Sequence, residues 1–168
     1  MDIQSQARCD WLDEIVNKYA DMVFRIAFAR TKNQADADDV FQDVFLKLCG
    51  SKIAFDSDEH VKAWLIRVTI NTSRKFFSSV WNKKTVELPT DLPVDEKYPR
   101  SETRSEVVEA VKHLPQKYGT VIHLFYYEEM SVAEIAAALG VNVNTIKSRL
   151  ARARKLLKPK LERSYTDV

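Results

Sequence analysis

The sequence predicts an all-α protein made of two small helical domains. Apolar side chains recur at steps of three and four residues through most of its length, which is the period of an amphipathic helix. Only three glycines occur among the 168 residues, too few for a turn-dense all-β protein. Between residues 81 and 104 the periodicity stops, and three of the five prolines fall in this stretch. We therefore expect a flexible linker at 81–104 between domains at 8–80 and 105–163.

Three amphipathic helices are expected in the first domain. The first carries the apolar stripe of Leu12, Ile15, Val16, Tyr19, Met22, Val23 and Ile26. The second is expected to bury Val40, Phe41, Val44, Phe45 and Leu48. The third is expected to bury Val61, Trp64, Leu65 and Val68. Its other face presents Arg67, Asn71, Arg74 and Ser78, at steps of four, three and four.

Capping residues predict where these helices begin and end. Asn33 can cap the second helix, because its side-chain oxygen can accept from an orphan backbone N–H. Gly50 is expected to stop that helix, since glycine is favoured just past a helix C-terminus. After a loop at 51–58, Asp56 and Glu59 form a capping-box-like start to the third helix.

The second domain contains the spacing of a helix-turn-helix. Ser131 and Glu134 form a capping box before a short helix, and Gly140 supplies the left-handed residue that ends it. Either Asn142 or Asn144 can cap the next helix. An αα-hairpin that binds no ligand has the same spacing. The outward-facing residues therefore have to distinguish such a hairpin from a DNA-binding helix-turn-helix.

Four further residues support this arrangement. Small Ala136 allows the two helices to approach, and Ile146 can lock their crossing. Pro115 is expected to open an upstream helix at its first turn, where a missing N–H does no harm. Pro159 is expected near the end of the last helix.

Charge is balanced over the whole chain and segregated along it. The net charge is +2. Residues 33–59 carry seven acidic and two basic side chains, whereas residues 60–86 carry six basic side chains and no acid. Residues 147–163 carry eight basic side chains and one acid. Two separate basic stretches indicate two contacts with a polyanion, and the acidic stretch is expected to face a different partner.

Several function classes lack their sequence signatures. The two cysteines, Cys9 and Cys49, form no CxxC pair, and the three histidines have no neighbours at metal-ligand spacing. No phosphate loop, GxGxxG, GxSxG or HExxH motif occurs. We therefore expect no enzyme activity, cofactor, metal or small-molecule substrate. No apolar run is long enough to insert into a membrane and no signal core is visible, so a cytoplasmic location is expected.

The outer face of the last helix points to DNA. Its candidate DNA-binding residues are Asn144, Lys147, Ser148, Arg149, Arg152 and Arg154. No acidic residue occurs from position 135 to 161. An α-helix fits the major groove, where residues near its N-terminus meet base edges and cations further along neutralise phosphates.

Two sequence blocks and this helix-turn-helix together resemble the extracytoplasmic-function (ECF) sigma factors of the sigma-70 family. The string from Ser131 to Pro159, VAEIAAALGVNVNTIKSRLARARKLLK between its ends, closely resembles their region 4. The segments at 36–49 and 60–77 resemble two parts of region 2. The resemblance implies a region 2 bundle and a region 4 helix-turn-helix, with core RNA polymerase and promoter DNA as partners. It also implies an anti-sigma factor.

The resemblance assigns roles to the first domain as well. The acidic helix is expected to dock on polymerase through Asp39, Gln42, Asp43 and Leu46. The following helix is expected to recognise and melt the minus-10 element through Arg67, Asn71, Arg74 and Lys75. Phe76, Phe77 and Trp81 offer flat surfaces for unpaired bases, although Phe76 suits the core equally. The loop is expected to capture a flipped-out base with Phe55 and Asp56. Region 4 would bind the minus-35 element.

Two other functions compete with this interpretation. A self-sufficient regulator that binds duplex DNA as a dimer explains the helix-turn-helix but leaves residues 33–80 without a role. A helical adaptor for protein interactions makes the basic helix incidental. Both remain open at the level of the sequence.

Overall fold

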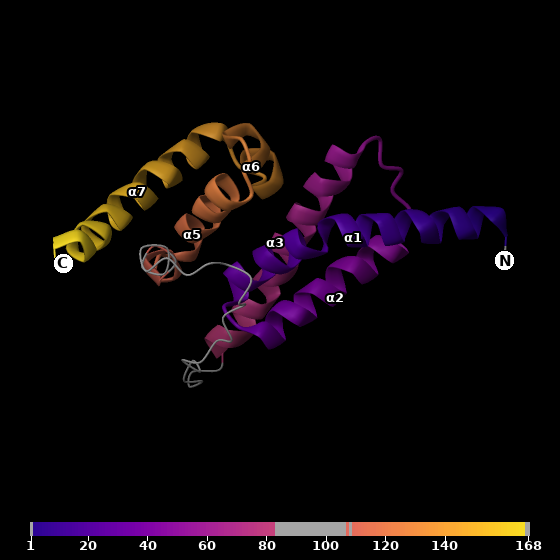
Figure 1. Ribbon diagram of the computed structural model, residues 1–168, viewed down its shortest axis with the longest axis horizontal. Coiled ribbons are helices and arrows are strands. Elements are labelled where there is room, and N and C mark those ends of the chain that lie inside the picture. Colours follow the sequence, from indigo (N-terminus) through magenta and orange to yellow (C-terminus); the bar gives the residue numbers. More distant parts are fainter. Residues whose placement is uncertain (1, 83–106, 108, 167–168) are drawn as a thin grey trace. The chain divides into compact units, whose positions relative to one another are not determined.

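The structure is a computed structural model that describes residues 2–82, 107 and 109–166, with side chains for 2–76, 107 and 109–162. Every regular element in these ranges is a helix (Figure 1), which confirms the all-α prediction. The chain divides into two compact units, Met1–Lys84 and Thr85–Val168. Most of the predicted linker at 81–104 lies outside the described residues. The domain limits 8–80 and 105–163 stay predictions.

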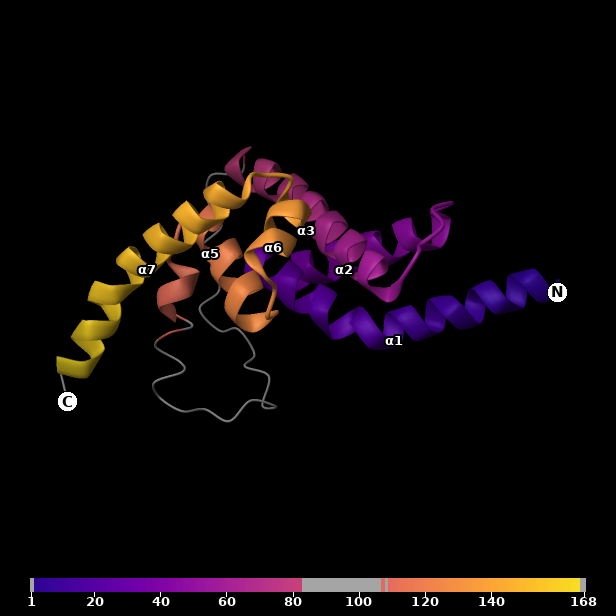
Figure 2. The same ribbon diagram turned by 90° about the horizontal axis from the view of Figure 1, so that it is seen from above.

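The first unit packs α1 (Ile3–Thr31), α2 (Gln34–Gly50) and α3 (Asp58–Asn82) against one another. The expected stripes supply most of its core, and Ile26, Val40 and Leu65 are each at most 1% exposed. Some stripe residues are only half-buried: Leu12, Val16, Phe41, Trp64 and Val68. Burial of such side chains is the main favourable term in folding. The N-terminal turns of α1 extend past the other helices of this unit (Figures 1 and 2).

One of the three predicted helix ends in this unit is confirmed, and two differ from the prediction. Asn33 Oδ1 accepts from the Asp36 N–H at 2.8 Å, as predicted. Gly50 is the last residue of α2 without adopting a left-handed conformation, and Ser51 is the C-cap in extended conformation. Asp56 does not cap α3. Ser57 does, because its Oγ accepts from the N–H of His60, three residues on, at 3.2 Å.

The second unit contains α5 (Gln116–Ile122), the π-helix η1 (His123–Tyr127), α6 (Val132–Leu139) and α7 (Val143–Thr166). Residues 109–112 are also helical. Its core includes Leu124, Ile135 and Ile146, each fully buried. Gly140 ends α6 with φ 68°, the predicted left-handed conformation. Ser131 Oγ accepts from the Glu134 N–H at 3.1 Å, so the predicted cap is present.

Three local features differ from the sequence prediction. Pro159 lies inside α7, which continues to Thr166, rather than near its end. Proline has no N–H, so the carbonyl of Lys155 has no donor at position 159; Pro159 and Lys155 are both exposed, where water can donate instead. Pro115 is the N-cap of α5 rather than part of its first turn. The π-helical turn after α5 carries no sequence signal that periodicity detects.

Among the described helices, none is long and apolar enough to cross a membrane.

Candidate nucleic-acid interface

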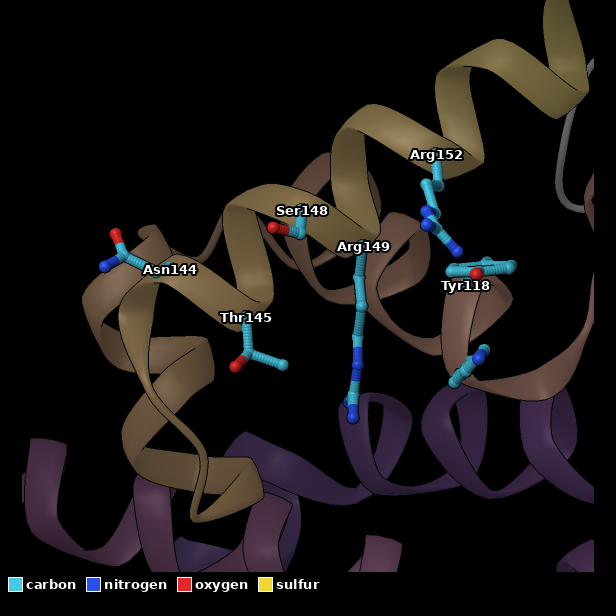
Figure 3. A pocket seen from close by; sticks show the side chains of 7 residues that line it. Tyr118, Asn144, Thr145, Ser148, Arg149 and Arg152 are labelled. Carbon is cyan, nitrogen blue, oxygen red and sulfur yellow. The ribbon is translucent and has the colours of Figure 1, made fainter.

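An open hollow with a basic lining lies between α5 and the N-terminal half of α7 (Figure 3). It is lined by Lys117, Tyr118, Asn144, Thr145, Ser148, Arg149 and Arg152. Four of these are candidate DNA-binding residues from the sequence. Lys117, Tyr118 and Thr145 complete the lining and were not predicted.

The local sequence explains why these side chains point outward. Asn142 caps α7, since its Oδ1 accepts from the Asn144 N–H at 2.8 Å, which decides between the two predicted caps. Ile146, Leu150, Ala153 and Leu157 are buried on one side of α7. At 3.6 residues per turn, Asn144, Ser148 and Arg152 must then occupy the opposite side. All three are exposed.

Arg152 and Tyr118 form a contact between α7 and α5. In Figure 3 the Arg152 side chain extends toward the ring of Tyr118. A hydrogen bond from the Arg152 guanidinium lowers the pKa of the Tyr118 hydroxyl, and the charge of Lys117 acts in the same direction. The tyrosine therefore restrains one of the candidate DNA-binding arginines.

Lys147 and Arg154 do not line this hollow. Lys147 is exposed elsewhere on α7. Arg154 Nε donates to the Tyr126 hydroxyl at 2.9 Å, and its guanidinium lies 5.8 Å from the ring centroid of Phe125. Arg154 thus lies against the aromatic residues of η1, although it remains exposed.

A second basic surface covers α3. Arg67, Asn71, Arg74 and Lys75 are all exposed, as predicted. Arg74 Nη1 donates to the side-chain oxygen of Asn71 at 3.3 Å. Phe76 is half-buried, while the side chains of Phe77, Ser78 and Trp81 lie outside the described residues.

A buried arginine adds positive charge behind this surface. Arg30 of α1 is 7% exposed, and its Nε donates to Ser73 Oγ at 2.5 Å. Burial, followed by repulsion from Arg74, lowers the pKa of Arg30 to about 10. Arg30 remains protonated near neutral pH and so contributes to the potential that an approaching phosphate meets.

The loop before α3 is held by aromatic residues. The Phe55 ring stacks on Trp11 with centroids 5.8 Å apart and 24° between the planes. The rings of Trp64 and His60 meet Phe55 edge-on, at 5.7 and 5.2 Å. Asp56 is exposed, and its backbone N–H donates to His60 Nδ1 at 3.3 Å. Trp11 was not predicted to take part.

The acidic candidates share one exposed face of α2. Asp39, Gln42, Asp43 and Leu46 are exposed, whereas Val40 and Val44 on the opposite side are fully buried. Leu46 is 67% exposed. Leu46 thus adds one apolar side chain to a face that is otherwise acidic and polar.

Comparison with known proteins identifies the family. Sigma-70 region 2 matches residues 15–82, and sigma-70 region 4 matches residues 104–157. RNA polymerase sigma factor SigV of Bacillus subtilis (strain 168) is 31% identical over 141 residues, covering 82% of this chain and 83% of SigV. ECF RNA polymerase sigma factor SigW of the same bacterium is 27% identical over 167 residues, covering 90% and 89%. The chain belongs to the ECF sigma factors of the sigma-70 family.

A solved structure agrees with the fold of this sigma factor. The sigma factor RpoE of Bartonella quintana, crystallised with the anti-sigma factor NepR, matches with a TM-score of 0.73 at 23% identity. The match covers 91% of this chain and 97% of RpoE. Arg8 and Trp11, the residues of α1 that contact the loop before α3, precede the region 2 match, which begins at residue 15.

Proposed function

We propose that this ECF sigma factor binds core RNA polymerase and directs promoter-specific initiation through the minus-10 and minus-35 elements. One observation carries the proposal: each unit matches a different sigma region and presents its own exposed basic helix face. Two such faces in one chain suit two separate contacts with DNA. The protein acts by binding rather than by catalysis, in the compartment where polymerase and DNA lie, the cytoplasm.

For the minus-35 element, α7 enters the major groove from its N-terminal end. Asn144 lies in the first turn of α7 and Ser148 one turn further along, and both approach base edges. Lys147 and Arg152 reach bases or flanking phosphates, and Arg149 contacts a phosphate. Each phosphate that is neutralised releases a counterion. The contact with Tyr118 keeps Arg152 in place and so lowers the entropy lost on binding. Arg154 contacts a phosphate from the edge beside η1.

For the minus-10 element, the exposed face of α3 meets the DNA. Asn71 approaches a base edge, while Arg67, Arg74 and Lys75 hold phosphates. The loop with Phe55 and Asp56 receives an unpaired base. Opening the duplex costs about 1.4 kcal/mol for each base-pair step. Binding of exposed bases by the protein offsets this cost, so melting needs no nucleotide hydrolysis by the sigma factor.

The acidic face of α2 is the proposed contact with polymerase. Asp39 and Asp43 pair with basic residues of the polymerase, and Leu46 seals the rim of the contact. We also propose that an anti-sigma factor competes for surfaces of this chain. Support comes from RpoE, which was crystallised with its anti-sigma factor NepR.

A transcription assay with randomised templates tests the proposal. The library carries two randomised elements upstream of a common reporter sequence, and transcripts are made with core polymerase in the presence or absence of the chain. We expect chain-dependent transcripts from templates enriched in two separate elements, and this enrichment defines a selected template for later experiments. Transcription that is independent of the chain would refute the proposal.

A DNA-binding selection from the same randomised library, with and without core polymerase, separates the two competing functions. A self-sufficient dimeric regulator would select palindromic DNA in the absence of polymerase. A helical adaptor would select no DNA under either condition. Neither competitor accounts for both sigma matches in one chain.

A further inference from the structure

We propose that the N-terminal turns of α1 clamp the minus-10 loop, and that Phe55 is a positioning residue within it. The loop is residues 51–57, between α2 and α3. The inference rests on the proposed function, since it concerns how the loop is prepared for an unpaired base. The clamp residues are Arg8 and Trp11.

Arg8 and Trp11 bind the loop at two points. Arg8 Nη2 donates to the carbonyl oxygen of Ser51 at 2.7 Å, where α2 has just ended. Trp11 stacks on Phe55, four residues further along the loop. The Arg8 guanidinium also lies 5.9 Å from the Trp11 ring centroid, so the two clamp residues support each other.

The remaining contacts fix the loop from the other side. Trp64 and His60 of α3 meet the Phe55 ring edge-on. The Ile53 N–H donates to Ser51 Oγ at 3.1 Å, and the Asp56 N–H donates to His60 Nδ1. The loop is therefore ordered before any nucleic acid arrives, which reduces the entropy that capturing a base would cost.

This geometry divides the work between the two candidate residues of the loop. One face of Phe55 is occupied by Trp11, and Trp64 and His60 surround the ring. A base cannot stack on the face that Trp11 covers. The side chain of Asp56 is 93% exposed and can accept hydrogen bonds from a base. Phe55 therefore acts through its neighbours, and Asp56 makes the direct contact.

The first measurement needs no DNA. Amide hydrogen exchange at Ile53 and Asp56 is followed in the full chain for the wild type, Trp11→Leu, Trp11→Phe and Arg8→Ala. Ile3→Ala is the matched control, because Ile3 lies on the same helix and is 86% exposed. An aromatic contact of this kind accounts for roughly a three- to tenfold change in an equilibrium. We expect exchange to rise by that factor in Trp11→Leu, to be restored in Trp11→Phe and to be unchanged in Ile3→Ala.

The second measurement uses core polymerase and the selected template. We expect Trp11→Leu and Arg8→Ala to slow promoter opening about three- to tenfold, with unchanged affinity for polymerase and for a minus-35 duplex. Trp11→Phe should restore opening, which a general loss of stability would not allow. If Trp11→Leu unfolds the first unit, Arg8→Ala still tests the clamp, because it removes only an exposed hydrogen bond and the cation–π contact with Trp11.

Each result has a defined meaning. Unchanged exchange in both Trp11→Leu and Arg8→Ala would overturn the clamp. Faster exchange with unchanged opening would overturn its role in recognition. A wild-type chain that cannot open the selected template with polymerase would overturn the proposed function, and with it that role, whatever the exchange rates show.

Discussion

Reversing the two carboxylates on α2 should abolish most of the affinity for core RNA polymerase. The variant is Asp39→Arg with Asp43→Arg. Both side chains are exposed, four residues apart on the face opposite fully buried Val40 and Val44. Residues 39 and 43 carry like charges in the wild type and again in the variant. The free energy of unfolding should therefore change by less than about 0.5 kcal/mol.

The magnitude follows from Coulomb's law. A pair of unit charges 4 Å apart interacts by about 1 kcal/mol in water and about 4 kcal/mol near a protein surface. Reversal replaces attraction by repulsion, which doubles the difference to at least about 2 kcal/mol for each residue. Two residues give about 4 kcal/mol, or roughly a thousandfold in the dissociation constant.

Fluorescence anisotropy of the chain, labelled at its N-terminus and titrated with core polymerase, measures this effect. Asp13→Arg with Glu14→Arg is the matched control, since both residues are exposed on α1 and the net charge changes equally. We expect the α2 variant to bind roughly a thousandfold more weakly, with the difference shrinking at high salt. A change of less than twofold, or an equal loss in the control, would refute the assignment of this face.

Three further predictions concern the second unit. Arg152→Ala should lower transcription from the selected template about tenfold or more, through loss of a base or phosphate contact, and leave polymerase affinity unchanged; lost polymerase binding would contradict the division of labour between the units. Arg152 lowers the pKa of the Tyr118 hydroxyl in the folded chain. The interaction therefore stabilises the fold at a pH above the ordinary tyrosine pKa, and this stabilisation is lost as the pH falls through the lowered pKa of Tyr118. Ultraviolet absorbance should therefore show one tyrosine ionising early, a transition that Tyr118→Phe removes and Arg152→Ala moves to higher pH; identical titrations in all three proteins would exclude the contact. Gly140→Ala should lower the free energy of unfolding of this unit in urea by about 1–2 kcal/mol, because φ at Gly140 is 68°. Gly119→Ala is the control and should not destabilise the unit, since the added Cβ meets Val111 O at an ordinary 3.6 Å. Equal effects of the two substitutions would argue against backbone strain at Gly140.

Local sequence patterns predicted most of the helices and much of their burial. Val40, Val44 and Leu48 follow the apolar period and are all fully buried. Asn33 and Gly140 occupy positions where the backbone requires their chemistry, so single residues sufficed to predict these boundaries. The outward faces of α2, α3 and α7 followed from the same periods.

Contacts between distant segments could not be predicted in this way. Trp11 meets Phe55 only because α1 extends beside the loop, and nothing in either local segment indicates the other. Tyr118 has the apolar spacing of a core residue and is buried, and its spacing does not indicate that it also lines the hollow beside Arg152. Periodicity reports which face of a helix is covered, and tertiary packing decides what covers it.

Local propensity also misplaced several boundaries, among them those at Pro159 and Asp56. Pro159 was expected near a helix end, but α7 continues past it to Thr166 at a place where Lys155 and Pro159 are both exposed. Asp56 was expected to cap α3, but its neighbour Ser57 takes that position and leaves the Asp56 carboxylate exposed. The second difference bears on function, because it is this exposed carboxylate that we assign to base contact.

The dependence of DNA binding on polymerase tests the central claim most directly. Hydroxyl-radical footprints on the selected template are compared for the chain alone, for core polymerase alone and for the two together. We predict two separated protected elements that appear only when chain and polymerase are both present. Protection of both elements by the chain alone, at the same concentration, would contradict a function that depends on the larger enzyme.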